Sequence, residues 1–494
     1  MSTSPGAFVD EFAIEHDASD GLYLAWIEQR GEGRRLLCRH LDSPGSLSGA
    51  WPQHGLLLCD SLLTPRRLRL ISDEGGGAYI VWVTSPLHST DPGAVSWRAQ
   101  HVLSGGTVDP AWPSTGVTLR SPAGPLAALG ETAVAADGKG ALVAAWGILT
   151  NGIAKLFVSR IGTNGLSGPG WGPNGNAVAP AAGPQDQVLL AGDGLGGLYV
   201  AWSGAESLGG PRHFRLQHRL STGGVAPGWS ADGDLPFSSD AVSDAVLAAD
   251  GYGGAYVACM EITGASPDVY LQHATFASPI DPGWPPTGRS ITFAAGVEQP
   301  LGLVSDREGG VIVAWAAGAC PGCSVDLLAE RRLADGTIPI GWGSGVLLAG
   351  AVSRPIRASV ASDAAGGALL CWSIPDPDEV PRGRAQRVLM DGRAGGTVAV
   401  EGSLPTDSKL RARPNPSRVG FTMDFVLPAP APVQLWIVDL AGRMVWSRSA
   451  DCEAGPARWF WDGRNSLGVR VPAGSYFARL STPGGQSGLR LIVP

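Results

Sequence analysis

The sequence predicts an all-β protein in which a seven-bladed β-propeller is followed by a small immunoglobulin-like β-sandwich. Two observations predict this fold class. One short motif recurs at a nearly constant spacing between Gly21 and Trp372 of the 494-residue chain. The repeat then stops, and residues 413–494 show short alternating strands separated by Gly-containing turns.

The repeated motif is clearest at Asp193–Trp202, which reads D-G-L-G-G-L-Y-V-A-W. The copies end at residues 26, 82, 146, 202, 259, 315 and 372. The repeat period is therefore about 56 residues, with one longer gap after Trp82, and such a fixed period is typical of proteins built from one recurring supersecondary unit. The other copies are Gly21–Trp26, which is degenerate, Asp73–Trp82, Asp137–Trp146, Asp250–Cys259, Asp306–Trp315 and Asp363–Trp372.

Each copy predicts four strands. Its Asp-Gly and Gly-Gly pairs suit a tight hairpin turn between an apolar run such as Val246–Ala249 and the motif's own strand. A Gln/His/Arg segment such as Gln272–Ala274 follows as the third strand. A second signature, such as Trp284–Gly288, precedes the fourth strand in most copies. A period of about 56 residues leaves about 14 residues for each strand and its turn, which suits short antiparallel strands.

Seven four-stranded units predict a propeller because closing the ring protects strand edges that an open sheet would expose. The seventh unit lacks the Trp signature, but Thr397–Val400 offers an outer strand. Phe12–Glu15 would be the innermost strand of the first blade, so closure needs no strand exchange with the N-terminus. The predicted domains are the propeller at 1–400, a polar linker at 401–412 and a β-sandwich at 413–494.

The last segment carries several motifs in a fixed order. They are Asn415-Pro416, Asp439-Leu440-Ala441-Gly442-Arg443, Trp461-Asp462-Gly463-Arg464 and Pro472-Ala473-Gly474-Ser475-Tyr476-Phe477. On these motifs the segment resembles the immunoglobulin-like domain of the flagellar hook-capping protein and the C-terminal sorting domains of type IX secretion substrates. The resemblance implies a module for export or surface attachment, with the secretion machinery as a partner. The propeller repeats resemble no named family.

Charge and hydropathy exclude several partners. The net charge is −8, with Lys139, Lys155 and Lys409 as the three lysines, so we expect no nucleic acid partner and no anionic membrane surface. The sequence contains no run of about 18 apolar residues, so we expect no membrane span. The N-terminal segment shows no basic region followed by an apolar stretch, so no signal peptide is visible. The expected location, extracellular or cell surface, therefore depends on the C-terminal resemblance.

The seven cysteines form a scattered set. Cys259 replaces the motif Trp and Cys371 precedes it by one residue, so we expect both to be small buried core residues. Cys320 and Cys323 differ, because they flank Pro-Gly in a loop after a motif strand. A second Cys pair at metal-ligand spacing and a thioredoxin-like setting are both missing, so a loop-closing disulfide is the preferred interpretation.

The recurring polar and aromatic residues are interpreted as structural. The turn aspartates could in principle form a ring of carboxylates that binds calcium. The D-x-D-x-D-G pattern of calcium-binding loops is absent, however, and Asp is a favoured turn residue, so a structural role in the turns is preferred. The motif Trp residues could form a sugar-stacking platform, but their fixed place in the repeat favours packing between blades. His101, His218 and His273 occupy equivalent third-strand positions, and we expect solvated strand faces there.

No nucleophile elbow, zinc-binding helix or phosphate-binding loop occurs. We therefore expect no catalytic residues, metal site or cofactor. The first hypothesis is a non-enzymatic, secreted or surface-associated scaffold that binds an unknown protein or glycan. The second is a propeller hydrolase or lyase acting on polysaccharide, and the third is a structural spacer of an envelope assembly. Carboxylates in irregular loops would serve the second hypothesis, provided that two approach within about 10 Å; the candidates are Glu261, Asp268, Glu298 and Asp326.

Overall fold

The computed structural model divides into two compact units. The first comprises residues 1–375 and 385–397, and the second comprises residues 376–384 and 398–494. The structure describes residues 8–493 except 18–20, 31–32, 43–45, 48, 50, 53, 61–63, 86–94, 121–126, 151–152, 181–182, 208–209, 239–241, 262–266, 292–295, 320–322, 344, 353–356, 364, 375–381, 396–409, 414–416, 418–419, 428–429, 439–443, 454, 466–467 and 483–484.

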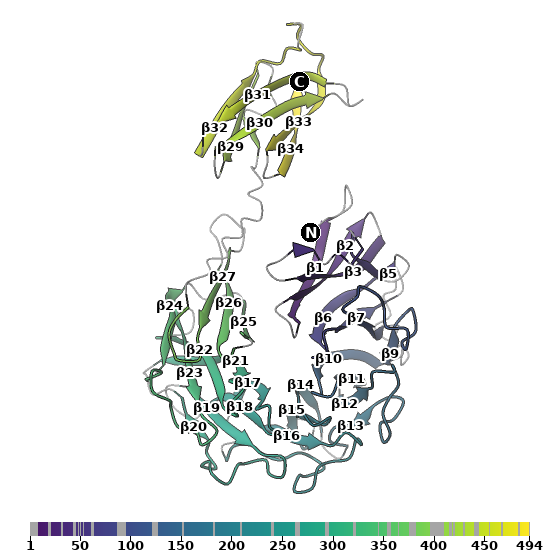
Figure 1. Ribbon diagram of the computed structural model, residues 1–494, viewed down its shortest axis with the longest axis vertical. Helices are drawn as coiled ribbons and strands as arrows, with labels where there is room; N and C mark the ends of the chain where they lie inside the picture. Colours follow the sequence, from purple (N-terminus) through teal and green to yellow (C-terminus); the bar gives the residue numbers. More distant parts are fainter. Residues whose placement is uncertain are drawn as a thin grey trace. The chain divides into compact units, whose positions relative to one another are not determined.

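The first unit consists of seven antiparallel sheets that follow one another along the chain (Figure 1). In each sheet the first three strands pair in the order of the sequence, as expected for hairpin-connected repeats, and in sheet 1 both β4 and β5 pair with β3. Sheet 1 contains β1 (Phe8–His16), β2 (Leu22–Arg30), β3 (Gly33–Asp42), β4 (Ser46–Leu47) and β5 (Leu56–Asp60); sheet 2 contains β6 (Arg66–Ser72), β7 (Ala78–Thr84), β8 (Ser96–Val102) and β9 (Val117–Arg120); sheet 3 contains β10 (Ala127–Ala136), β11 (Leu142–Thr150), β12 (Ile153–Ile161) and β13 (Asn176–Ala177).

The remaining sheets of this unit repeat the same order. Sheet 4 contains β14 (Gln185–Gly192), β15 (Leu198–Ala205) and β16 (Arg212–Arg219); sheet 5 contains β17 (Val242–Ala249), β18 (Ala255–Glu261), β19 (Asp268–Ala274) and β20 (Arg289–Ser290); sheet 6 contains β21 (Val297–Ser305), β22 (Val311–Gly318), β23 (Val325–Arg332) and β24 (Val346–Val352); sheet 7 contains β25 (Arg357–Ser362), β26 (Ala368–Ile374) and β27 (Arg382–Val388). The predicted outer strand Thr397–Val400 lies outside the described residues.

Each motif forms the second strand of its sheet, where it has a hydrogen-bonded neighbour on both sides. In sheet 4, for example, β15 pairs with β14 through Ala191↔Tyr199 and with β16 through Tyr199↔His218. The strand is buried along both faces because each sheet also packs against its neighbours. This position explains why the motif is rich in small and bulky apolar residues.

The two signatures of the repeat contact each other. Gly233, from the second signature of sheet 4, has a φ of +77°, and a Cβ atom added there would lie 2.3 Å from the ring of Trp202. Gly55, Gly116, Gly175 and Gly345 lie in the same way against Trp26, Trp82, Trp146 and Trp315. The glycine is therefore needed both for its backbone conformation and for the space that the Trp ring fills.

The second unit has two antiparallel sheets around one core. One sheet contains β28 (Arg411–Arg413), β29 (Phe421–Leu427) and β32 (Gly455–Trp461), and the other contains β31 (Met444–Cys452), β30 (Ala431–Val438), β33 (Gly474–Thr482) and β34 (Gly485–Val493). Phe421, Leu435 and Trp461 are fully buried between them. The core therefore draws on both sheets, as in a two-layer β structure.

Parts of the sequence resemblance fall within the described residues of this unit. The indole nitrogen of Trp461 donates a 2.7 Å hydrogen bond to the carbonyl of Arg464, and the Asp462 carboxylate accepts one from the Arg464 amide. The Tyr476 hydroxyl donates to the carbonyl of Pro472. These motifs therefore stabilise turns. Asn415-Pro416 and residues 439–443 lie outside the described residues.

Candidate functional site

The turn aspartates hold the hairpin turns of all seven sheets. The Oδ1 atom of Asp193 accepts hydrogen bonds from the amides of Leu195 and Gly197, at 2.7 and 2.8 Å. The equivalent residues Asp17, Asp73, Asp137, Asp250, Asp306 and Asp363 accept corresponding turn amides. The predicted structural role is confirmed, since these side chains are occupied by the backbone.

The second oxygen of each turn aspartate binds a basic side chain on the third strand. In sheet 4 the Oδ2 atom of Asp193 is 3.0 Å from the Nε2 atom of His218. The same pairs in the other sheets are Asp17–His40, Asp73–His101, Asp137–Arg160, Asp250–His273, Asp306–Arg331 and Asp363–Arg387, at 2.6 to 3.1 Å. The aspartates are thus paired within their own sheets instead of forming a common ring.

The expectation that His101, His218 and His273 lie on solvated strand faces is wrong. All three are buried, and each imidazole stacks on the tyrosine opposite it, with ring centroids 4.3 to 4.5 Å apart. Burial alone would lower the pKa of His101, but hydrogen bonds to Asp73 and Asp109 outweigh burial and raise it. The physical reason is the hairpin, which places the third strand beside the turn aspartate.

Tyrosine and tryptophan side chains connect each sheet to the one after it. The hydroxyl of Tyr199 donates to the carbonyl of Gly253 in sheet 5, and the indole nitrogen of Trp229 donates to the carbonyl of Phe276. Equivalent Trp donors recur at Trp51, Trp112, Trp171, Trp284 and Trp342. The recurring aromatic residues therefore serve architecture, and a site must be sought among residues that differ between sheets.

The motif tryptophans are core residues, as predicted. Trp26, Trp82, Trp146, Trp202, Trp315 and Trp372 are at most 5% exposed. In sheet 5, where Cys259 replaces the Trp, the ring of Phe237 lies against Gly288 in its place. Cys259 is fully buried, whereas the expectation of a buried Cys371 is wrong, because that thiol is exposed on sheet 7.

The predicted disulfide involves a loop of sheet 6. Cys323 is disulfide-bonded, whereas Cys38, Cys259, Cys371 and Cys452 are thiols. Cys320, its predicted partner, lies outside the described residues, so the pairing stays a prediction.

Three of the four candidate carboxyls come together where sheets 5 and 6 meet. Glu261 at the end of β18 lies directly opposite Asp268 at the start of β19, which places their Cβ atoms about 5 Å apart. Glu298 comes from β21, and its amide donates a 3.2 Å hydrogen bond to the carbonyl of Pro267, next to Asp268. These three side chains are called the carboxyl cluster below. They meet the condition of the second hypothesis, an approach to within about 10 Å.

The three members of the carboxyl cluster have different surroundings. Glu298 is 2% exposed, and burial, assisted by the charge of Asp268, raises its pKa to about 7. Glu261 and Asp268 are half-buried, and burial and the charge of Glu261 raise the pKa of Asp268. The hydroxyl of Tyr270 is hydrogen-bonded to Glu261. A carboxyl with a raised pKa thus lies beside two more accessible carboxyls.

Asp326 does not belong to the carboxyl cluster. It lies on β23 of sheet 6, where its neighbour across the strands is Ala317, and its carboxylate accepts a 2.8 Å hydrogen bond from the amide of Ala351. Its side chain is exposed. Asp326 therefore has a local role in fixing the edge strand β24.

A cavity of about 500 Å³ is lined by the first strands of sheets 1 to 5. Three charged side chains reach it, from Glu15, Arg69 and Glu74, among apolar residues such as Ile71 and Leu190. Burial raises the pKa of Glu15 to about 7. These residues are not predicted from the sequence; Glu15 and Glu74 stand close to the turn aspartates, and comparison of the seven repeats would have singled them out.

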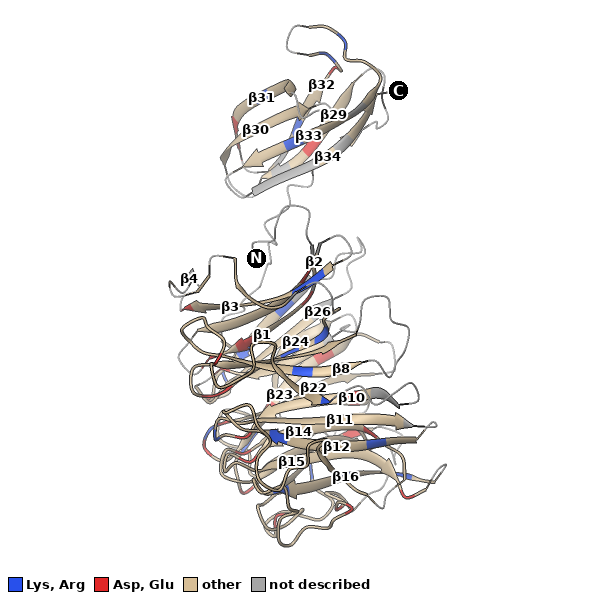
Figure 2. Ribbon diagram, turned by 90° about the vertical axis from the view of Figure 1, so that its right-hand side faces the viewer, with Lys and Arg blue, Asp and Glu red and all other residues tan. Residues whose placement is uncertain are grey.

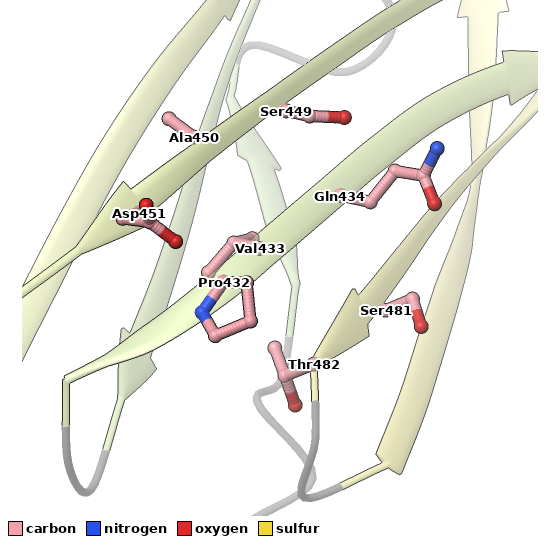
Figure 3. Close-up of a pocket in the computed structure, with 8 residues that line it drawn as sticks. All are labelled: Pro432, Val433, Gln434, Ser449, Ala450, Asp451, Ser481 and Thr482. Atoms are coloured by element: carbon pink, nitrogen blue, oxygen red, sulfur yellow. The ribbon is translucent and has the colours of Figure 1, made fainter.

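Other surface features of the described residues carry less chemistry. Acidic and basic residues are interspersed over the visible face of the first unit (Figure 2). A hollow of about 610 Å³ on the second unit is lined by β30, β31 and β33, and Asp451 is its one titratable side chain (Figure 3). Within the described ranges, no three His, Cys, Asp or Glu side chains are arranged to hold a metal ion, and no helix could cross a membrane.

Comparison with known proteins gives likenesses of fold. No family model matches the chain, and no curated protein matches it. A Hadza microbial sialidase structure is similar, with 11% identity, a TM-score of 0.36, and coverage of 72% of this chain and 74% of that one. An arabinanase from Penicillium chrysogenum has 12% identity, a TM-score of 0.30, and coverage of 63% and 89%. PorZ, a surface component of the type IX secretion system of Porphyromonas gingivalis, has 12% identity, a TM-score of 0.22, and coverage of 99% and 82%.

The expectation of a non-enzymatic binding scaffold is corrected by these findings. The sialidase and the arabinanase are named as enzymes that act on carbohydrates, whereas the sequence analysis expected no enzyme. At such identities the likeness describes the fold alone, so an activity has to be argued from the residues of this chain. The structure itself shows an all-β protein built from antiparallel sheets.

Proposed function

We propose that this chain is a glycoside hydrolase of the β-propeller type that acts on polysaccharide, with its catalytic carboxyls at Glu261, Asp268 and Glu298. The observation that carries the proposal is the raised pKa of Glu298, about 7, beside two more accessible carboxyls. Glycoside hydrolysis needs one carboxyl that is protonated near neutral pH and another that is ionised.

The roles follow from the surroundings of each group. Glu298 holds its proton because burial penalises its charged form, so it would protonate the oxygen of the departing sugar. Glu261 or Asp268, which both reach solvent, would either take a proton from the water that attacks the anomeric carbon or attack that carbon itself as the nucleophile. The hydroxyl of Tyr270 would fix the orientation of Glu261.

The rest of the proposal concerns architecture and location. The seven sheets would form a seven-bladed propeller, and the second unit would be an immunoglobulin-like module. Its likeness in motifs to hook-capping and type IX sorting domains supports a role in export or attachment at the cell surface, through the secretion machinery.

The test is sugar release from a panel of polysaccharides by the purified full chain. The variant Glu298→Gln and one of the two variants Asp268→Asn and Glu261→Gln should reduce release at least about a hundredfold, the usual contribution of acid–base catalysis. Asp326→Asn is the matched control, because Asp326 is a carboxyl of the same region outside the cluster. Equal activity in all four variants would contradict the assignment, and unsaturated products would indicate a lyase instead.

A further inference from the structure

The cavity of about 500 Å³ lies at one end of the first strands of sheets 1 to 5, next to the hairpin turns. In sheets 2 to 5 the three residues before the turn aspartate line it, such as residues 247–249 before Asp250. The carboxyl cluster lies at the other end, because Glu261 pairs with Val242 at the start of the same strand. Seven residue steps of about 3.3 Å separate Val242 from Ala249, so the two sites are roughly 20 Å apart.

Sheets 1 and 2 supply the charged side chains of this cavity. Glu15 stands two residues before Asp17, where every other sheet has Ile, Ala or Val. Arg69 stands four residues before Asp73, where no other sheet has a charged residue. Glu74 follows Asp73 directly, at the mouth of the cavity. These three charges therefore do not belong to the repeated architecture.

None of the three charged side chains has an ion-pair partner among the residues that the structure describes. Glu15 is half-buried, and burial raises its pKa to about 7 with no basic neighbour opposing the rise. Arg69 donates only to the carbonyl of its neighbour Leu68. Burial and nearby aspartates raise the pKa of Glu74, despite two more distant basic groups. Because a charge withdrawn from water needs a counter-charge, these groups are suited to a charged ligand.

The backbone at Glu74 supports a role for its charge. Its φ of +61° lies in the left-handed region, which disfavours residues with a Cβ atom. The same position holds Gly138, Gly194 and Gly251 in sheets 3, 4 and 5, with φ between +74° and +85°. Among the described residues, Arg307 of sheet 6 shares the exception, with a φ of +64°. Charged residues are thus kept at this end of the unit where glycine would be less strained.

The wall opposite these charges is apolar. Sheets 3, 4 and 5 contribute small and branched aliphatic residues to it, such as Val134, Ala191 and Leu247. No Trp, Tyr or Phe is among the described residues that line the cavity, although aromatic rings are the surfaces on which sugar rings usually stack. The cavity therefore suits an aliphatic ligand with charged groups at one side, and its size is that of an ordinary small-molecule site.

We propose that this cavity binds a small aliphatic zwitterion, either an apolar α-amino acid or a short apolar peptide. The ammonium group of the ligand pairs with Glu15 and Glu74, and its carboxylate pairs with the guanidinium of Arg69, whose planar N–H donors match a carboxylate. Arg69 stands two residues farther from its turn than Glu15 does, roughly 7 Å along a strand, so the two ends of the ligand lie at different depths. The aliphatic part packs on the wall of sheets 3 to 5.

Isothermal titration calorimetry of the purified full chain tests the class of ligand. Leucine and leucyl-leucine are the probes, 3-methylbutylamine lacks the carboxylate, 4-methylpentanoate lacks the ammonium group, and glucose represents a sugar. At least one zwitterion should bind, and both charge-deleted analogues should bind at least about tenfold more weakly. Tighter binding of leucine would identify the ligand as a free amino acid, and tighter binding of leucyl-leucine as a peptide. Binding of neither zwitterion, or equal binding of an analogue or of glucose, would overturn the proposal.

Variants of the full chain locate the binding. Arg69→Gln and Glu15→Gln should each weaken binding of the responsive zwitterion at least about tenfold. Arg66→Gln is the matched control and should bind normally, because Arg66 is an exposed arginine of the same strand outside the cavity lining. Glu298→Gln should also bind normally, which separates this cavity from the carboxyl cluster. Unchanged binding in Arg69→Gln and Glu15→Gln proteins that melt like the wild type would place the ligand elsewhere and contradict the proposal.

Discussion

Gln185 and Glu298 occupy the same position in different sheets, eight residues before the turn aspartate. The amide of Gln185 bridges sheets 3 and 4: it accepts a 2.8 Å hydrogen bond from the Leu156 amide and donates a 2.7 Å bond to the carbonyl of Ala179. Glu298 brings a carboxyl to the matching place between sheets 5 and 6, where its Oε2 atom is buried without a hydrogen-bond partner among the described residues. A protonated carboxyl resembles a side-chain amide in shape, and it likewise has both a donor and an acceptor.

The first prediction concerns stability and pH. The folded protein raises the pKa of Glu298 from 4.5 to about 7, so it binds the proton more tightly than the unfolded chain does. The resulting stabilisation is complete below pH 4.5 and is lost as the pH rises to about 7, which amounts to about 3 kcal/mol of unfolding free energy. Glu298→Gln should remove this dependence and stabilise the protein at pH 8. Urea unfolding at pH 5 and pH 8 checks it, and equal pH slopes in wild type and variant would contradict it.

The second prediction concerns the activity. If Glu298 is the general acid, sugar release must fall as the pH rises through about 7, because the proton is then lost. Rates measured between pH 5 and pH 9 with a responsive polysaccharide should show this basic limb. Glu298→Gln should be inactive throughout while folding normally, which separates a catalytic role from a structural one. An unchanged basic limb in that variant would assign the limb to another group.

The third prediction concerns the pairing of tyrosine with histidine. Histidine on the third strand lies opposite tyrosine in sheets 1, 2, 4 and 5, whereas arginine lies opposite an aliphatic residue in sheets 3 and 6. Tyr199→Val or His218→Arg alone should each cost about 2 to 4 kcal/mol, because each leaves a cavity or an unpaired group. The double variant should recover more than about 1 kcal/mol of that sum. A double-mutant cycle by denaturant unfolding measures it, and strict additivity would disprove the pairing.

The fourth prediction concerns the ring that replaces a missing tryptophan. Phe237 occupies the space beside Gly288 that a motif Trp fills elsewhere, so Cys259→Trp should overpack sheet 5 and lower stability by about 1 to 3 kcal/mol. Combining Cys259→Trp with Phe237→Ala should restore much of the loss. Thermal unfolding of the two variants checks this, and a stable single variant would show that the two rings do not compete.

The sequence was sufficient for the strands of the repeat but not for their side-chain pairs. Period and turn chemistry located the motif strands because Gly and Asp mark each hairpin locally. The bond between Asp193 and His218 joins residues 25 positions apart, so only the folded hairpin reveals it. The histidines were consequently assigned to solvent.

The carboxyl cluster could be predicted only in part from the sequence. Glu261, Asp268 and Glu298 were predicted as carboxylates of irregular loops, but the structure places them in strands β18, β19 and β21. What the sequence could not supply was the meeting of β18, β19 and β21, which turns separate carboxyls into coupled ones. Cys371 was misjudged for a related reason, since burial at its position requires a following sheet.

The bridges that tyrosine and tryptophan make between the described sheets point the same way along the chain. Each Tyr hydroxyl and Trp indole donates from an earlier sheet to a carbonyl of a later one, as in Tyr23 to Gly76 and Trp51 to Ser104. A ribosome therefore releases every sheet with its donors waiting for a partner not yet synthesised. For these aromatic bridges, removing sheet 7 would leave the Trp342 indole N–H without its acceptor, whereas removing sheet 1 would leave the carbonyls of Gly76 and Ser104 without their donors.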